Sequence, residues 1–169
     1  MHVLIATTGV LSPDPVVDFT RHLLGRNGRV TLTTVIEVPR NFLETIESEE
    51  WHPLQNDNGE VTPESRIARY VEERGRRLVE PVMQALEAAQ IPCDVQYLEG
   101  RDPAATISRA ANELEADLVI LGATRLIFDR DAWESVSARV MLESGKAVLV
   151  VPPPARDTEE KEETEPSTD

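Results

Sequence analysis

The fold of this chain is constrained most by five short, mostly apolar runs. Segments with helical periodicity separate these runs. Runs of this length, rich in β-branched residues, are typical of strands. We expect strands over residues 2–8, 29–38, 93–100, 117–121 and 147–151. Because apolar strands that alternate with helices need cover on both faces, the pattern predicts a parallel sheet. With right-handed crossovers it predicts a five-stranded, doubly wound α/β fold, a Rossmann-like three-layer α/β/α sandwich.

Two of the intervening helices have readable N-termini. In the first, Asp14 is the expected N-cap, Pro15 the first helical residue and Gly25 the residue after the last turn. Asp102 and Pro103 form a similar cap-and-proline pair later in the chain. The helix that follows them should bury one apolar face, made of Ile107, Ala110, Ala111 and Leu114.

A long loop, residues 39–62, precedes the longest predicted helix. That helix should begin at Thr62 and Pro63, and Pro81 should kink it, because proline removes a backbone donor and clashes with the preceding turn. The last helix is expected over about residues 132–144, with Gly145 as its stop.

Composition fits one acidic domain with an aliphatic core in this chain of 169 residues. The net charge of −14, with two lysines against fifteen arginines, disfavours binding to nucleic acids or to anionic membranes. No apolar run is long enough to span a bilayer and no targeting pattern is visible, so a cytoplasmic protein is expected. Residues 154–169 hold seven acids and two bases, and we expect a disordered tail after a domain of residues 1–153.

The predicted topology also indicates where a ligand would bind. In doubly wound sheets, ligands lie outside the carboxyl ends of the strands, where the winding reverses. This rule brings residues 7–10, 37–39 and 122–125 around one crevice.

The stretch LEGRDPAATISRAANELEADLVILGA carries a specific spacing of Gly100, Pro103, Ile107, Asp117 and Gly122. Together with VLIATTG near the start and SVSARVMLESGKAVLVVP near the end, it resembles the universal stress protein family over nearly all of residues 1–153. The resemblance implies an adenine nucleotide α-hydrolase-like fold with strand order 3-2-1-4-5.

Members of that family that bind ATP carry a glycine, a second glycine three residues later, and a Gly-Ser or Gly-Thr pair further on. Gly122 matches the first position, but Arg125 replaces the second glycine and Glu134-Ser135 replaces the pair. Thr8 stands where the nucleotide-binding members have an acidic residue. The resemblance therefore implies a degenerate ATP site. The candidate crevice residues are Thr7, Thr8, Gly9, Val38, Gly122, Ala123, Thr124, Arg125, Ser135 and Val136.

The chemistry of these replacements supports the same interpretation. A β-carbon at Arg125 restricts the close backbone approach that glycine allows. Asp131 and Glu134 form a capping-box-like pattern, which would occupy helix N–H groups that a phosphate needs. One alternative stays open: the side chains of Arg125 and Arg130 would hold ATP, with Mg²⁺, in place of the glycine loop.

No other motif predicts chemistry. Asp129 and Asp131 form a D-x-D without a third ligand at a set spacing, so a solvated loop explains them better than a metal site. The three histidines are scattered, and Cys93 is expected to be a small buried hydrophobe. Without a Ser-His-Asp, Cys-His or paired-carboxylate arrangement, we expect no enzyme, no metal and no cofactor.

The last strand should lie at the edge of the sheet, where an exposed apolar strand is a liability unless it is paired. In universal stress proteins this strand commonly pairs with its copy. Both arguments predict a homodimer with Val148, Val150 and Val151 near the seam. The expected role is stress-associated and exerted through unidentified protein partners. The alternatives are an ATP- or AMP-binding signalling module and a hydrolase or transferase of the wider fold group.

Overall fold

A computed structural model describes residues 1–25, 27–39, 41, 63–123 and 135–152. Within these ranges five parallel strands form one sheet in the order β3-β2-β1-β4-β5. The strands are β1 (His2–Ala6), β2 (Arg29–Ile36), β3 (Cys93–Glu99), β4 (Leu118–Gly122) and β5 (Ala147–Val151). The predicted α/β fold class and strand order are confirmed.

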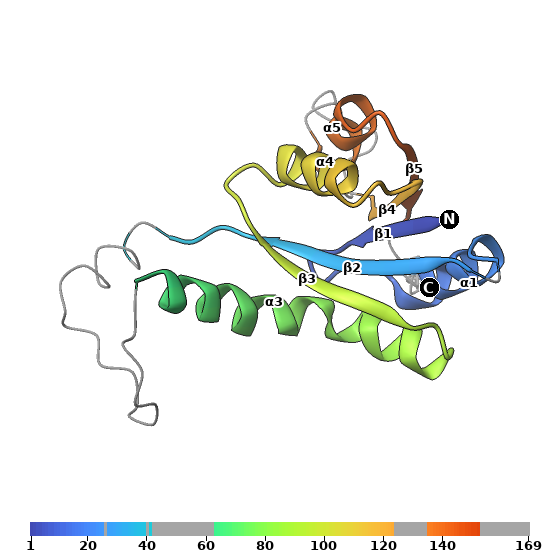
Figure 1. The fold of residues 1–169 in the computed structure, drawn as a ribbon, viewed down its shortest axis with the longest axis horizontal. Coiled ribbons are helices and arrows are strands. Elements are labelled where there is room, and N and C mark those ends of the chain that lie inside the picture. Colours follow the sequence, from blue (N-terminus) through green and yellow to red (C-terminus); the bar gives the residue numbers. More distant parts are fainter. Residues whose placement is uncertain (26, 40, 42–62, 124–134, 153–169) are drawn as a thin grey trace, which may run out of the picture.

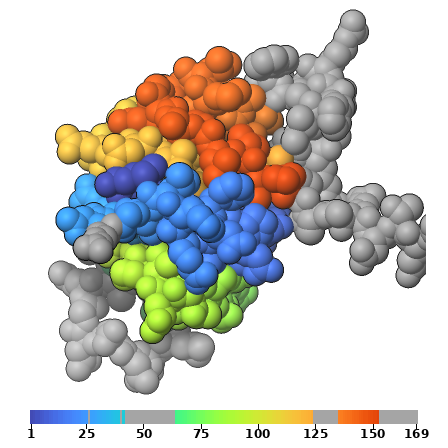
Figure 2. Space-filling model, turned by 90° about the vertical axis from the view of Figure 1, so that its right-hand side faces the viewer, coloured from blue at the N-terminus to red at the C-terminus, as the bar shows by residue number. Residues whose placement is uncertain are grey.

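Helices cover both faces of the sheet (Figure 1). α1 (Pro13–Leu23) and α3 (Pro63–Ala88) lie on one face, and α4 (Pro103–Glu113) and α5 (Val136–Glu143) lie on the other. Figure 2 shows this arrangement from the side, with α5 and β5 in orange to red, the N-terminal segments in blue and α3 with β3 in shades of green. None of the helices in the described ranges is long and apolar enough to cross a membrane.

The central strand β1 divides the core into two clusters. Val3 and Ile5 face α1 and α3, whereas Leu4 and Ala6 face α4 and α5. All four side chains are at most 4% exposed. β1 is therefore buried on both faces, as expected for the middle of a parallel sheet, and its carboxyl end opens onto the site described below.

β1 and β2 end earlier than the apolar runs in the sequence. β1 ends at Ala6 rather than Thr8, because the Thr7 N–H makes the last ladder bond, to the carbonyl oxygen of Thr33, and Gly9 then turns the chain with φ +88°. β2 ends at Ile36 rather than Val38, and β4 begins one residue after Asp117.

The N-terminus of α4 is as predicted, but that of α1 is not. Asp102 is the N-cap of α4, with Pro103 in the first turn. In α1 the N-cap is Ser12, whose backbone is extended, so the prediction of Asp14 as the cap was wrong. Two prolines lie close together here, and the helix begins at the first of them, since the fixed φ of proline suits a first helical position. Gly25 follows the helix with φ +58°, as expected.

α3 begins at Pro63 and continues through Pro81 as one helix, and the predicted kink stays a prediction. α5 begins at Val136 rather than near residue 132. Its N-cap is Ser135, so the prediction that Asp131 caps this helix in a capping-box-like pattern with Glu134 was wrong. The Ser135 hydroxyl is positioned to accept the N–H of the third helical residue, and it takes the capping role itself.

Candidate ligand cavity

A cavity of about 450 Å³ lies at the carboxyl ends of β1 and β4, beside the N-termini of α4 and α5. Its position agrees with the rule that ligands bind where a doubly wound sheet reverses its winding. The described residues that line it are Ala6, Thr7, Thr8, Val10, Leu11, Val35, Pro103, Ile107, Leu121, Gly122, Ala123, Val136 and Ser137.

The turn after β1 forms one wall of the cavity and is held by its own hydrogen bonds. The Thr7 hydroxyl accepts the Gly9 N–H at 3.0 Å. Gly9 has a φ of +88°, and a Cβ atom there would lie 3.0 Å from the Cδ2 atom of Leu78. The backbone conformation therefore favours glycine at this turn, and the Leu78 side chain on α3 would have to shift slightly to admit a β-carbon.

The chain leaves β4 through Gly122 and Ala123, at the opposite wall. The Ala123 N–H donates to the carbonyl oxygen of Val151 at 2.7 Å, so it is used by the sheet. A Cβ atom at Gly122 would make only an ordinary contact with Leu11, at 3.5 Å. Nothing in the described surroundings of Gly122 requires a glycine there.

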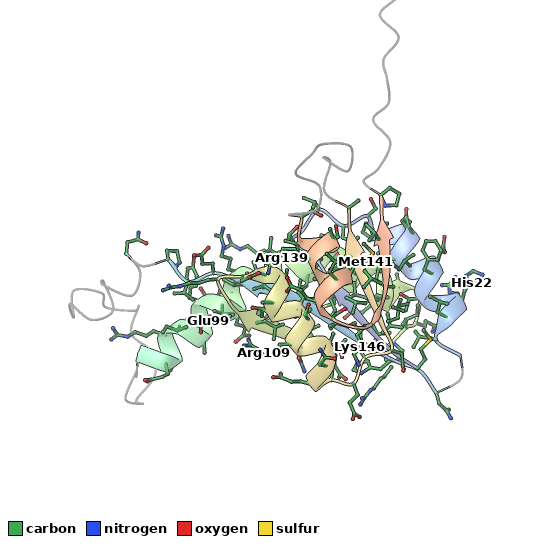
Figure 3. The ribbon with its side chains drawn as sticks, turned by 90° about the horizontal axis from the view of Figure 1, so that it is seen from above. His22, Glu99, Arg109, Arg139, Met141 and Lys146 are labelled. Atoms are coloured by element: carbon green, nitrogen blue, oxygen red, sulfur yellow. The ribbon has the colours of Figure 1, made fainter. Side chains whose placement is uncertain are left out.

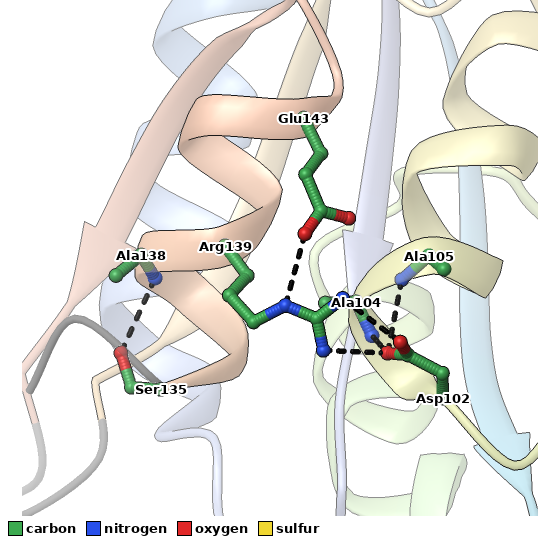
Figure 4. Close-up of polar contacts among 7 residues, drawn as sticks. All are labelled: Asp102, Ala104, Ala105, Ser135, Ala138, Arg139 and Glu143. Carbon is green, nitrogen blue, oxygen red and sulfur yellow. Dashed lines mark hydrogen bonds and ion pairs between the residues drawn. The ribbon is translucent and has the colours of Figure 1, made fainter. Parts of the chain in front are cut away.

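The N-terminus of α5 closes the cavity beside this exit. The Ser135 hydroxyl accepts the Ala138 N–H at 3.2 Å (Figure 4). It also lies 3.3 Å from the Ser137 hydroxyl, which is on the cavity wall. The serine that resembles part of the family's phosphate-binding pair is thus engaged by its own helix.

An ion pair fixes α5 to α4 next to the cavity. The Nη1 and Nη2 atoms of Arg139 donate to the two carboxylate oxygens of Asp102 at 2.9 and 2.8 Å (Figure 4). The Nε atom of Arg139 donates to Glu143 at 2.9 Å. Figure 3 shows α4 and α5 side by side, with Arg139 near their junction. Pro103 follows the N-cap of α4 and Val136 follows the N-cap of α5, and both residues line the cavity. The ion pair between Arg139 and Asp102 therefore sets the distance between the two helix ends on that wall.

The same carboxylate also caps α4. It accepts the N–H groups of Ala104 and Ala105 at 3.1 and 3.2 Å. The hydrogen bonds from Arg139 and then the bond from Ala105 lower the pKa of Asp102. The bonds to Asp102 and then to Glu143 raise the pKa of Arg139. Both groups therefore remain charged across the physiological pH range.

The structure brings part of the predicted crevice residues together at this cavity. Of the predicted crevice residues within the described ranges, five line the cavity: Thr7, Thr8, Gly122, Ala123 and Val136. Gly9 and Ser135 lie next to lining residues and hold the turn and the helix end in place. Thr124 and Arg125 lie outside the described residues.

Val38 lies elsewhere. It packs with Ile36 and Val71 in a separate cluster beneath α3, because β2 has already ended. Val35 of the same strand lines the cavity instead. Sequence reasoning also missed Pro103 and Ile107 of α4, although the apolar face of that helix was visible in its periodicity.

The remaining candidates do not form a site in the part of the chain that the structure describes. Cys93 is half-buried against the α1/α3 core, and burial, followed by the nearby Glu87 carboxylate, raises the pKa of its thiol. No group of three or more His, Cys, Asp or Glu side chains among the described residues could hold a metal ion. Asp129, Arg130, Asp131 and Glu134 lie outside these residues, as does the acidic tail.

Comparison with known proteins gives the family. The family model of the universal stress protein family matches residues 1–152. The chain belongs to the universal stress protein family. No curated protein sequence matches it.

Solved structures of universal stress proteins share this fold at low sequence identity. One, a universal stress protein in complex with cAMP, is 17% identical, with a TM-score of 0.62 over 89% of this chain and 96% of that one. A family member from Arabidopsis thaliana with AMP bound is 14% identical, with a TM-score of 0.55 over 95% and 97% of the two chains. One from Burkholderia pseudomallei is 19% identical, with a TM-score of 0.55 over 89% and 95%.

Proposed function

We propose that this universal stress protein domain is a stress-associated, non-enzymatic homodimer that acts through protein partners and has little or no affinity for ATP. The absence of any charged side chain on the described wall of the cavity carries the proposal. A triphosphate brings several negative charges, and these are favourable only where cations or free N–H groups receive them.

Two hydrogen-bonding groups near the β4 exit, among the described residues, are already engaged. Ala123 donates to β5, and the Ser135 hydroxyl receives an N–H of its own helix. A nucleotide would have to displace these bonds or bind without them. The loss of two charge-assisted hydrogen bonds, at about 1.5–3 kcal/mol each, lowers affinity roughly a hundredfold or more.

The second candidate function is a module that binds ATP or AMP. The relatives with cAMP and AMP bound favour it, because they share the fold of this chain. In this reading the side chains of Arg125 and Arg130 receive the phosphates in place of a glycine loop, with Mg²⁺ bound to the nucleotide.

Calorimetric titration of the full chain with Mg·ATP and with AMP separates the two candidates. We expect no binding heat in the micromolar range and no nucleotide released from the freshly purified protein. Micromolar binding that is lost in Arg125→Ala or Arg130→Ala would establish the second candidate and refute the first. Release of ADP from Mg·ATP at a rate above that of buffer would contradict the non-enzymatic role.

The edge strand β5 supports the homodimer. Val150 is 36% exposed on this strand, and Met141 and Leu142 of the neighbouring α5 are 49% and 69% exposed. The opposite edge differs, because β3 exposes polar side chains, among them Asp94 and Gln96. An unpaired apolar edge is the one that needs a partner.

The side chains of the three predicted seam residues differ in exposure. Val151 is only 1% exposed and packs in the α1/α3 core, so it is buried within its own chain. Val148 is half-buried against the α4/α5 cluster. Val150 therefore remains as the seam residue of β5, with Met141 and Leu142 beside it.

A further inference from the structure

We propose that the cavity binds a neutral, mainly apolar small molecule. The inference rests on the proposed function, since it assigns a different ligand to a cavity with little affinity for ATP. Nine of the thirteen described lining residues have hydrocarbon side chains, from Ala6 on β1 to Val136 on α5. A volume of about 450 Å³ lies within the range of small-molecule sites, which are predominantly apolar with a few polar groups.

The polar side chains among the described residues of the wall are few, and two of the three are paired within the protein. The Thr7 hydroxyl accepts the Gly9 N–H, and the Ser137 hydroxyl lies within hydrogen-bond distance of Ser135. An ionised ligand would leave water without finding partners in these groups, and the cost of such a transfer is high. A neutral ligand avoids that cost.

Among the described residues, Arg139 is a cation near this wall, and its side chain is also engaged. Arg139 lies one turn after the α5 N-cap, yet its guanidinium is bonded to both oxygens of Asp102 and to Glu143. It is not one of the residues that line the cavity. The ion pair thus holds a charged group at the α4/α5 junction while the cavity surface beside it stays apolar.

The same wall favours an apolar ligand directly. The sheet, the turn after β1 and the helices α4 and α5 all contribute aliphatic side chains to the wall, among them Val35, Leu121 and Ile107. A ligand that covers this surface gains the free energy of removing apolar area from water. Thr8, exposed at the rim, and Ser137 can bond one or two uncharged polar groups. The ligand class is an aromatic or branched aliphatic body with at most two such groups.

Fluorescence titration with N-phenyl-1-naphthylamine, an uncharged aromatic probe, tests the proposal on the full chain. We expect saturable binding at one site per chain, and no displacement of the probe by millimolar Mg·ATP. Val10→Asp should weaken the binding about fivefold or more, because it brings a carboxylate to the rim of an apolar site. Leu23→Asp is the control, since Leu23 on α1 is also an exposed aliphatic residue, at 40% against 75% for Val10, and is not among the described residues that line the cavity. It should leave the probe affinity unchanged.

The outcomes distinguish this proposal from the proposed function. If neither the probe nor Mg·ATP binds, the apolar ligand class is overturned and the proposed function stands. If Mg·ATP displaces the probe at micromolar concentration, both are overturned. Equal probe affinity in wild type and Val10→Asp places the probe elsewhere on the molecule and also overturns the ligand class.

Discussion

The ring of Tyr97 on β3 lies so close to Gly75 on α3 that a Cβ atom at Gly75 would overlap it. Gly75 is buried in the middle of a helix of 26 residues, where glycine costs about 1 kcal/mol relative to alanine. The contact explains why a glycine is found there. The missing side chain at Gly75 lets α3 lie close to the edge strand β3.

Gly75→Ala should therefore destabilise the protein although it improves helix propensity. Overpacking against the tyrosine ring costs about 1–3 kcal/mol, and the gain in propensity offsets about 1 kcal/mol of it. Urea denaturation measures the difference in the free energy of unfolding. Tyr97→Leu in the same background should recover most of the loss, and a Gly75→Ala protein more stable than wild type would refute the packing argument.

Asp102 should make stability depend on acid pH through its pair with Arg139. The pKa of Asp102 is lowered in the folded chain. The stabilisation of the fold by its carboxylate is therefore complete above the ordinary pKa of about 3.9, and it is lost as the pH falls through the lower pKa of the folded state. Asp102→Asn keeps a good N-cap and removes the charge. We expect a Tm about 2–4 °C below wild type at pH 7 and a narrowing difference toward pH 3 in thermal melts.

Glu113→Gln is the control for that experiment. Glu113 pairs with Arg109 at 3.9 Å on the exposed face of the same helix. Exposed pairs of this kind contribute little, so its Tm should change by less than about 1 °C. A difference for Asp102→Asn that is equally large at pH 3 and pH 7 would contradict the role of the charge.

His2 should contribute to stability through two side-chain hydrogen bonds at the other end of the sheet, one buried and one partly buried. Its Nδ1–H donates to the carbonyl oxygen of Leu114 at 2.9 Å, and its Nε2 atom lies 2.8 Å from the Thr31 hydroxyl. His2→Phe removes both bonds and leaves the Thr31 hydroxyl without its imidazole partner, whereas the Leu114 carbonyl keeps a bond from Arg29 at 3.3 Å. We expect a cost of about 1–3 kcal/mol in the free energy of unfolding. Chemical denaturation of His2→Phe, Thr31→Val and the double variant measures the coupling, and strictly additive losses would contradict it.

Val150→Lys should weaken self-association. The substitution places a charge on the exposed apolar edge, which is how natural edge strands avoid pairing. We expect light scattering to give a dimer mass for wild type at micromolar concentration, and a dissociation constant about tenfold higher or more for the variant. Gln96→Lys on the β3 edge is the control and should remain dimeric. A monomeric wild type at that concentration would refute the homodimer.

The elements that the sequence predicted best are those that a local pattern decides. The apolar strand runs allow one arrangement, a central sheet that is buried on both faces. In β1, the residues from Val3 to Ala6 alternate between the two core clusters in this way. The pair Asp102-Pro103 marked a helix start because both residues act within one turn. At α1, Ser12-Pro13 and Asp14-Pro15 offer two equivalent starts, and local chemistry does not choose between them.

The cavity depends on neighbours that are distant in sequence, and there local patterns fail. Val35 and Ile107 line it because β2 and α4 meet in space, whereas Val38 turns away once the strand has ended. The pair of Asp102 and Arg139 joins residues 37 positions apart. No periodicity in the sequence indicates which of fifteen arginines would approach that carboxylate.

The unequal edges of the sheet limit how many copies of this chain can assemble. A sheet with two apolar edges could add a further copy at each end and grow into a fibre. Here β3 carries charged and amide side chains, and only β5 is apolar, so two copies that join through β5 present only their polar edges outward. In the proposed dimer the same strand would be used from both sides of a two-fold axis, and growth would therefore stop at a closed pair.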